Sequence, residues 1–413
     1  MATNRQFRIC VKCNSIVSRR STPIGQRGVP ELDGNYGTTT VETRGLPKRD
    51  LWLLPLISLA TLLVLVIVAE AAARIAWPEQ KTNSCTKPDS ALGYRFMPDC
   101  TSRMKSAEGP WYTNDYNDCG YRSAQPCTPV PAGTRRIALI GSSLAEGYLV
   151  PYPDTIGARL AQDLTRRCGA PVEVQNLGGM GYFSARRPML RLEEALTLRP
   201  NAVILVLTPF DLETGIMEEE EDLTPAGPVV NHLGVRGRLF IHLKESRAFM
   251  MAQHFRFRDM AVYLPLYLNY GDKADYLRPP FTPPWQERLR RLDERLGQLS
   301  ERAHAAAVPL VIAFVPQEAE LVLMTQQAPP PGVHPDALPE AIAAIAARHD
   351  VGFVDTSDVL KTQANPELLY YQVDGHLSGD GQPLAAQSIA RWFGAGLFST
   401  CQADHSSAPE ATP

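Results

Sequence analysis

Two adjacent serines follow a short apolar run about a third of the way along the chain, where one of them could serve as a nucleophile. Residues 137–140 are all apolar and end at a glycine, which predicts a buried parallel strand. Ser142 and Ser143 come directly after it. Open α/β sheets bind their ligands at the carboxyl ends of such strands. The alternative interpretation is that both serines only turn the chain and cap its backbone.

A carboxylate and a histidine stand close together near the end of the chain. Asp374 and His376 flank a glycine just before the last expected helix. A surface turn is the alternative interpretation of this loop. A second glycine-rich turn, residues 178–181, follows another expected strand, and glycine lets backbone N–H groups approach a reacting oxygen. A serine, a glycine turn and an Asp-His pair at strand ends together fit a hydrolytic triad.

The elements that must position these residues alternate between strands and helices. Alternation of this kind predicts an α/β fold with a parallel, doubly wound sheet. The next regular element after the serines is expected to be a helix, with Asp154 as its N-cap. The expected strands cover 137–140, 172–176, 202–207, 309–315 and 352–354, and the expected helices cover 154–167, 286–306, 339–348 and 382–393.

An apolar segment precedes this α/β pattern. Residues 51–69 carry no charge and, as a helix, are long enough to cross a hydrocarbon core of about 30 Å. Nine Lys and Arg residues precede the segment, whereas only Arg74 and Lys81 follow it closely. The positive-inside rule therefore predicts a cytoplasmic N-terminus and a C-terminal domain on the other side of the membrane.

Cysteine usage agrees with that topology. Six of the 8 cysteines lie beyond the apolar segment, and an even set in an oxidising compartment suggests disulfides. Local pairs are expected between Cys85 and Cys100 and between Cys119 and Cys127. A third pair is predicted between Cys168 and Cys401, which follow the first and last helices of the α/β pattern. The length and composition give these expected parts: a disordered cytoplasmic tail at 1–50, a transmembrane helix at 51–77, a cysteine-containing neck at 78–133, the α/β domain at 134–400 with an insertion or lid at 215–285, and a disordered tail at 401–413.

The short motifs occur in the order found in a known group of enzymes. At these residues the chain resembles the SGNH/GDSL hydrolase superfamily, in particular its membrane-anchored bacterial members. The resemblance covers about residues 117–393. Its blocks are residues 136–164 with Gly141-Ser142-Ser143 at the Gly-Asp-Ser position, residues 176–181, residues 208–212, and the Asp374/His376 loop, preceded by the run 117–122.

The resemblance implies a three-layer α/β/α, flavodoxin-like fold and a role for each motif residue. Ser143 would be the nucleophile, His376 the general base and Asp374 the group that orients it. The backbone N–H groups of Ser143 and Gly181 would form part of the oxyanion hole. No metal or organic cofactor is implied.

Three positions depart from the family pattern. Ser142 replaces the usual Asp of the first block, and Asp374 precedes His376 by two residues where many relatives have three. Phe210 replaces the Asn whose side chain supplies the third oxyanion donor in the family. Loss of one such donor typically costs about 3 kcal/mol, on the order of a hundredfold in rate.

These features together predict a protein of the bacterial inner membrane with a single-pass anchor and a periplasmic domain. The expected function is that of a serine esterase, acyl hydrolase or acyltransferase, which would act on ester-linked acyl groups of an envelope glycan or lipid. The alternatives are a catalytically degenerate glycan-binding or scaffold protein, and an anchor whose function lies in its cytoplasmic tail. A net charge of −3 and the lack of a basic stripe argue against a nucleic-acid partner.

Overall fold

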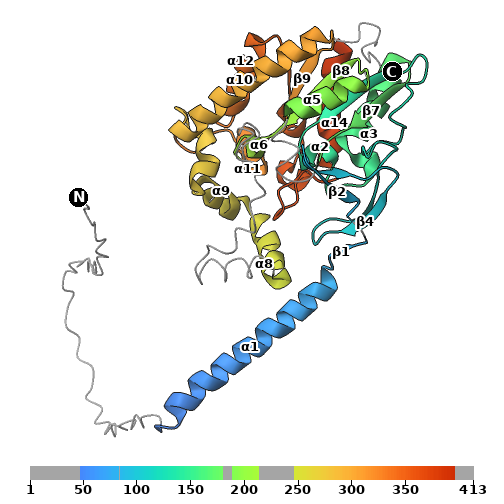
Figure 1. Ribbon diagram of the computed structural model, residues 1–413. Helices are drawn as coiled ribbons and strands as arrows, with labels where there is room; N and C mark the ends of the chain where they lie inside the picture. The colour runs from blue at the N-terminus through green and yellow to red at the C-terminus, as the bar shows by residue number, and fades with distance from the viewer. Residues whose placement is uncertain (1–46, 83, 180–187, 214–245, 396–413) are drawn as a thin grey trace, which may run out of the picture. The chain divides into compact units, whose positions relative to one another are not determined.

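The computed structural model of the protein describes residues 47–82, 84–179, 188–213 and 246–395 (Figure 1). Several of the sequence-based expectations therefore lie outside the described residues. These are nearly all of the N-terminal tail, the first half of the insertion, Gly181, Cys401 and the C-terminal tail.

The apolar segment forms one long helix, α1 (Asp50–Ala76). Within the described ranges it is the one helix whose length and composition would allow it to cross a membrane. Its leucine, isoleucine and valine side chains are exposed in the isolated chain, as expected for side chains that face lipid. Residues from Ala60 onward belong to the same compact unit as the α/β domain.

Five parallel strands form the central sheet in the order β10-β9-β8-β6-β7. Because β6 is the first of the five along the chain, the chain winds to one side through β7 and then to the other side through β8, which is the flavodoxin-like order. The expected fold class and all five expected strands are confirmed. The strands are β6 (Arg135–Ile140), β7 (Val172–Asn176), β8 (Ala202–Leu207), β9 (Leu310–Phe314) and β10 (Gly352–Asp355).

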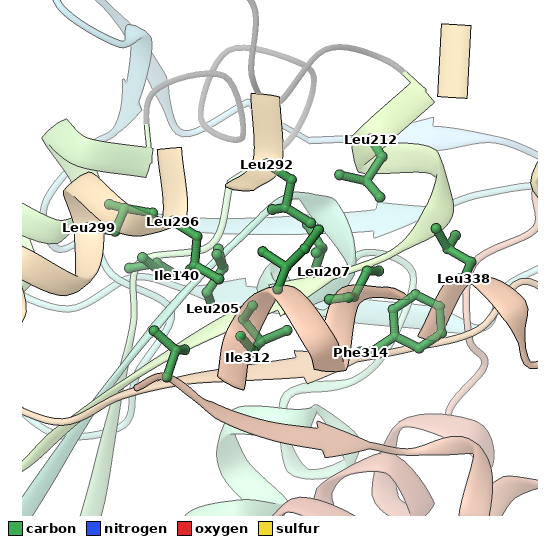
Figure 2. Close-up of a cluster of buried hydrophobic side chains, with 14 of the residues drawn as sticks. Ile140, Leu205, Leu207, Leu212, Leu292, Leu296, Leu299, Ile312, Phe314 and Leu338 are labelled. Atoms are coloured by element: carbon green, nitrogen blue, oxygen red, sulfur yellow. The ribbon is translucent and has the colours of Figure 1, made fainter. Parts of the chain in front are cut away.

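Helices cover both faces of the sheet, because alternate strand residues point to opposite sides. Ile140 and Leu205 contribute to the core beneath α5 (Pro188–Thr197), α10 (Pro283–Ala305) and α12 (Ala337–Arg348), part of which Figure 2 shows. Leu139 and Ile204 contribute to the opposite core beneath α3 (Ile156–Cys168) and α14 (Gly381–Ala395).

The expected cap of α3 is wrong by one residue. Tyr152–Asp154 form a 3₁₀ turn, η1, so Asp154 lies before the helix boundary. Thr155 is the N-cap, and its hydroxyl accepts a hydrogen bond from the N–H of Ala158 at 3.3 Å. A threonine hydroxyl satisfies the same unpaired donor that a carboxylate would.

The neck contains more regular structure than its sequence indicated. It contains a three-stranded antiparallel sheet and a hairpin, and the expected disulfides Cys85–Cys100 and Cys119–Cys127 are both present. A small apolar cluster around Phe96 and Tyr116 supports it. The strands are β1 (Gln80–Lys81), β4 (Thr101–Lys105) and β5 (Trp111–Asp115) in the sheet, and β2 (Thr86–Asp89) and β3 (Gly93–Phe96) in the hairpin.

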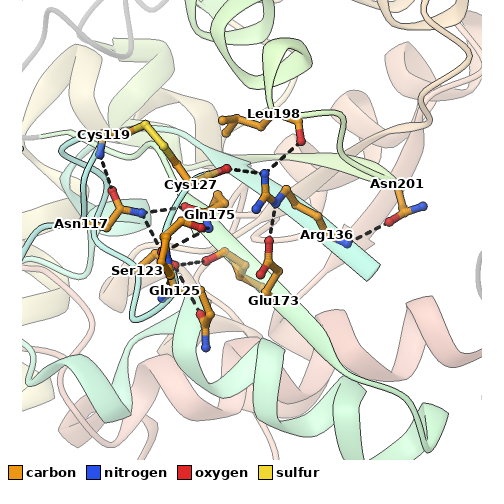
Figure 3. Close-up of polar contacts among 12 residues, drawn as sticks. Asn117, Cys119, Ser123, Gln125, Cys127, Arg136, Glu173, Gln175, Leu198 and Asn201 are labelled. Carbon is orange, nitrogen blue, oxygen red and sulfur yellow. Dashed lines mark hydrogen bonds and ion pairs between the residues drawn. A yellow bond between two sulfur atoms is a disulfide. The ribbon is translucent and has the colours of Figure 1, made fainter. Parts of the chain in front are cut away.

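A buried arginine joins the neck to the central sheet. Arg136 of β6 pairs with Glu173 of β7 and donates to the carbonyl oxygens of Cys127, at 2.5 Å, and Leu198, at 3.1 Å (Figure 3). A buried charge is tolerated only when it is paired and hydrogen-bonded. This arrangement therefore fixes the second disulfide loop against the first strand of the sheet.

The remaining elements are short and lie in the loops and in the insertion. The second half of the insertion is helical, whereas its first half is outside the described residues. These elements are α2 (Ser143–Glu146), α6 (Pro209–Glu213), α8 (Arg247–Phe257), α9 (Met260–Leu268), η4 (Gly271–Leu277), α11 (Glu318–Thr325), α13 (Ser357–Leu360) and η5 (Pro366–Leu369).

Candidate active site

The nucleophile candidate stands at the sharp turn between β6 and α2. Gly141 has a φ of 150°, and a Cβ atom there would lie 2.8 Å from the Cβ of Ala145 and 2.9 Å from the carbonyl oxygen of Val206. Only glycine fits this turn. Ser143 is the first residue of α2, so its backbone N–H has no acceptor within the helix.

The structure brings the three triad candidates together. Ser143 Oγ lies 2.7 Å from His376 Nε2, and His376 Nδ1 lies 2.5 Å from Asp374 Oδ1. The histidine and the aspartate are both partly exposed, with 23% and 33% of their side chains accessible. A serine, an imidazole and a carboxylate in this sequence of contacts can transfer a proton from the hydroxyl to the ring.

The loop that carries Asp374 and His376 is held by its own backbone. The N–H of Tyr371 donates to the carbonyl of His376 at 2.9 Å, and Ser378 donates to Leu369 at 2.7 Å. Gly375 has a φ of 84°, which places the turn in the left-handed region that favours glycine. The ring of Tyr148 packs edge-on to His376, with ring centroids 5.2 Å apart.

The departure at Ser142 is accompanied by a carboxylate on the neighbouring strand. Asp211, which is 1% exposed, follows β8 and accepts hydrogen bonds from the N–H and the hydroxyl of Thr208 at 2.8 and 2.7 Å. Burial raises the pKa of Asp211, and hydrogen bonds from Thr208 and Ser142 oppose that rise. The hydroxyl of Ser142 is therefore a hydrogen-bond donor to the buried carboxyl group of Asp211. In the family pattern, the residue at the position of Ser142 is itself an Asp.

Phe210 occupies the position where the family pattern has an amide. It lies in α6 at the carboxyl end of β8, which is the strand next to β6. Its side chain is 40% exposed. The ring therefore lies outside the two main cores.

Arg122, to which no role was assigned from the sequence, supports the turn that carries Ser143. Its guanidinium, 2% exposed, donates to the carbonyl oxygens of Glu146, Gly147 and Val150 at 3.0, 2.6 and 2.7 Å. These carbonyls lie at the end of α2 and just beyond it. The sequence signal for Arg122 was its place in the run 117–122, which is part of the family resemblance. That run did not indicate which groups the arginine contacts.

Asn117, the first residue of the same run, ties the neck to β7. Its side-chain amide donates to Gln125 and Gln175, and its side-chain oxygen accepts from the backbone of Cys119 and Tyr121 (Figure 3). The second glycine turn starts at the end of the same strand, and Gly179 N–H donates to the carbonyl of Gly141 at 3.2 Å. The start of this turn therefore lies beside the nucleophile. Gly181, the predicted oxyanion donor, is outside the described residues, so its role stays a prediction.

Comparison with known proteins agrees with this geometry. The family described as GDSL-like Lipase/Acylhydrolase matches residues 139–384, which is more than half of the chain and includes Ser143, Asp374 and His376. No curated protein matches the sequence.

Solved structures of several esterases and lipases are similar to this chain. A lipase/acylhydrolase from Enterococcus faecalis is 13% identical, with 63% of this chain and 95% of that chain covered and a TM-score of 0.35. An acetylxylan esterase from Geobacillus stearothermophilus is 16% identical, with coverage of 65% and 97% and a TM-score of 0.35.

Proposed function

Because the chain belongs to the GDSL-like lipase/acylhydrolase family, we propose that it is a serine-dependent enzyme in which Ser143 attacks a carboxylic ester. The observation that carries this proposal is the continuous set of contacts from Ser143 Oγ to His376 Nε2 and from His376 Nδ1 to Asp374. His376 takes the hydroxyl proton as general base, and Asp374 holds the ring in the tautomer that leaves Nε2 free to accept it.

The reaction then proceeds in two steps. Attack by Ser143 gives a tetrahedral intermediate, and its oxyanion would be met by the backbone N–H groups of Ser143 and Gly181. Collapse expels the alcohol, which takes its proton from His376, and leaves an acyl-serine. Water or another hydroxyl then attacks the acyl group with His376 again as base. An ester hydrolase and an acyltransferase differ only in this second acceptor.

The membrane placement is part of the same proposal. The apolar helix α1 and the excess of Lys and Arg before it support a single-pass anchor in a bacterial inner membrane, with the α/β domain in the periplasm. The two disulfides of the neck fit an oxidising compartment. An enzyme so held would meet ester-linked acyl groups on an envelope glycan or lipid.

Phe210 favours a second candidate, a binding or scaffold protein that keeps the fold without catalysis. An exposed ring stands where the family has an oxyanion donor. The two candidates separate when the full-length protein in detergent micelles is incubated with a panel of acyl esters from acetyl to long-chain. Release of acid or acyl transfer that Ser143→Ala abolishes supports the enzyme. Folded wild type that turns over no ester supports the binding protein.

A further inference from the structure

A carboxylate from the neck holds the loop that carries the general base. Glu108 is 3% exposed at its side chain, and its Oε2 accepts the backbone N–H groups of Val373 and Asp374 at 3.0 and 2.9 Å. Val373 N also lies 3.2 Å from Oε1. Hydrogen bonds to a carboxylate are stronger than those between neutral groups. The position of Asp374 therefore depends on a residue 266 positions earlier in the chain.

The second oxygen of Glu108 is engaged by the insertion. Oε1 lies 2.6 Å from Nδ1 of His254, which belongs to α8. Nδ1 must carry the proton in this contact, because a carboxylate can only accept. Glu108 thus joins the catalytic loop to α8 through its two oxygens.

A second buried carboxyl group, Glu318, lies near Glu108. Burial and the charges of Glu108 and Glu367 raise the pKa of the neighbouring Glu318 to about 9. Glu318 is therefore neutral at pH 7 and does not compete with Glu108 for the donors of Val373, Asp374 and His254. Its protonated carboxyl removes a repulsion that a second negative charge would bring.

Helix α8 is in turn fixed to the end of α1. Glu70 of α1 accepts hydrogen bonds from Ser246 Oγ at 2.7 Å and from the N–H groups of Arg247 and Ala248 at 3.1 and 3.0 Å. The indole of Trp77, just beyond α1, packs edge-on to the ring of His254 with centroids 4.9 Å apart. Contacts thus run without a break from the end of the apolar helix through α8 to Glu108 and Asp374.

We propose that Glu108 is a positioning residue of the active site, which sets the Asp374/His376 loop and makes its geometry depend on α8 docked at the end of α1. This inference rests on the proposed function. Glu108 touches neither the hydroxyl of Ser143 nor the ring of His376, so it acts through the backbone of Asp374. A displacement of about 1 Å in a catalytic group can cost on the order of a hundredfold in rate.

The carboxylate charge strengthens every hydrogen bond that Glu108 accepts. In Glu108→Gln the remaining oxygen can still accept the two backbone N–H groups, but as a neutral acceptor, and the NH₂ group can only donate. The NH₂ group can meet His254 only if the ring proton moves from Nδ1 to Nε2, so the substitution weakens the contacts of Glu108 on both sides. The matched control is Glu340→Gln, which makes the same change at an exposed acid of α12. His254→Ala removes only the contact with α8.

The first test uses the full-length chain in detergent micelles with p-nitrophenyl acetate. We expect Glu108→Gln to lower kcat by about tenfold or more with KM within about twofold, and His254→Ala to lower kcat in the same direction but less. Glu340→Gln should match wild type. All rates refer to the folded fraction from a thermal melt. Wild-type kcat in folded Glu108→Gln would overturn the positioning role, and wild-type kcat in His254→Ala would overturn the coupling to α8.

A second test does not depend on activity. Hydrogen exchange of the peptide covering 371–378 should be faster by about tenfold or more in Glu108→Gln, at the amides of Val373 and Asp374, and unchanged in Glu340→Gln. Exchange at the wild-type rate in Glu108→Gln would overturn the inference. A wild type that hydrolyses no ester but shows this difference would reject the proposed function and keep the positioning contact.

Discussion

Phe210→Asn tests how much catalytic rate is lost because position 210 carries no oxyanion donor. The family pattern has an amide donor at this position, and one donor aimed at the oxyanion is typically worth about 3 kcal/mol. An amide built onto α6 without further optimisation should recover part of that, so we expect kcat for an acyl ester to rise by about tenfold. Position 210 lies in α6, just after β8, and β8 pairs directly with β6, the strand that precedes Ser143.

The cost to the fold follows from the exposure of the ring. Because 40% of Phe210 is accessible, roughly 120 Å² of a ring of about 200 Å² is covered, which corresponds to at most about 3 kcal/mol of stability. Kinetics must therefore be referred to the folded fraction, measured by urea unfolding of each variant.

Phe210→Asp is the matched control, because Asp has the size of Asn but presents acceptors instead of donors. It should lower kcat or leave it unchanged, since a negative charge opposes the developing oxyanion. An equal rise in both variants would mean that removal of the ring merely opens the site. No change in Phe210→Asn, with wild type active, would refute the idea that position 210 faces the oxyanion.

Three other predictions concern the support of the site. Arg122→Met should lower the free energy of unfolding in urea by about 3–5 kcal/mol, because three carbonyls of the nucleophile turn lose a charged donor; a loss below about 1 kcal/mol would contradict this. Glu318 has a folded pKa of about 9, so the folded state binds its proton more tightly than the unfolded state and stability falls as pH rises from about 5 to 9. Glu318→Gln should reduce that fall when urea unfolding is compared at pH 5 and pH 8, and an unchanged slope would argue against it. Peptide mapping without reductant should find Cys168 linked to Cys401. Detection of either cysteine as a free thiol would contradict that pairing.

The sheet could be predicted because its strands are apolar runs with clear ends. Residues 137–140 and 202–207 are buried on both faces, and such strands are uniformly apolar in sequence. Ser143 and His376 could be proposed because few residue types can serve as nucleophile and base. The N-cap of α3 could not be assigned to a single residue from the sequence, because Asp154 and Thr155 are both good N-cap residues.

The support of the site lies in contacts that sequence spacing does not reveal. Glu108 stands in the loop between β4 and β5, and its partners His254 and Asp374 are 146 and 266 residues away. Likewise Ser142 and Asp211 come together only because β6 and β8 are neighbours in the sheet. A carboxylate in a loop is usually a solvated residue, so nothing in the local pattern marks Glu108 as buried.

The central claim is that Ser143 is a nucleophile activated by His376. The most direct measurement is the intact mass of the full-length protein after reaction with a fluorophosphonate, for wild type, Ser143→Ala and His376→Ala. We expect a single adduct on wild type, mapped to the peptide with Ser143, and essentially none on either variant. Folded wild type without an adduct, or an adduct that persists in Ser143→Ala, would contradict it.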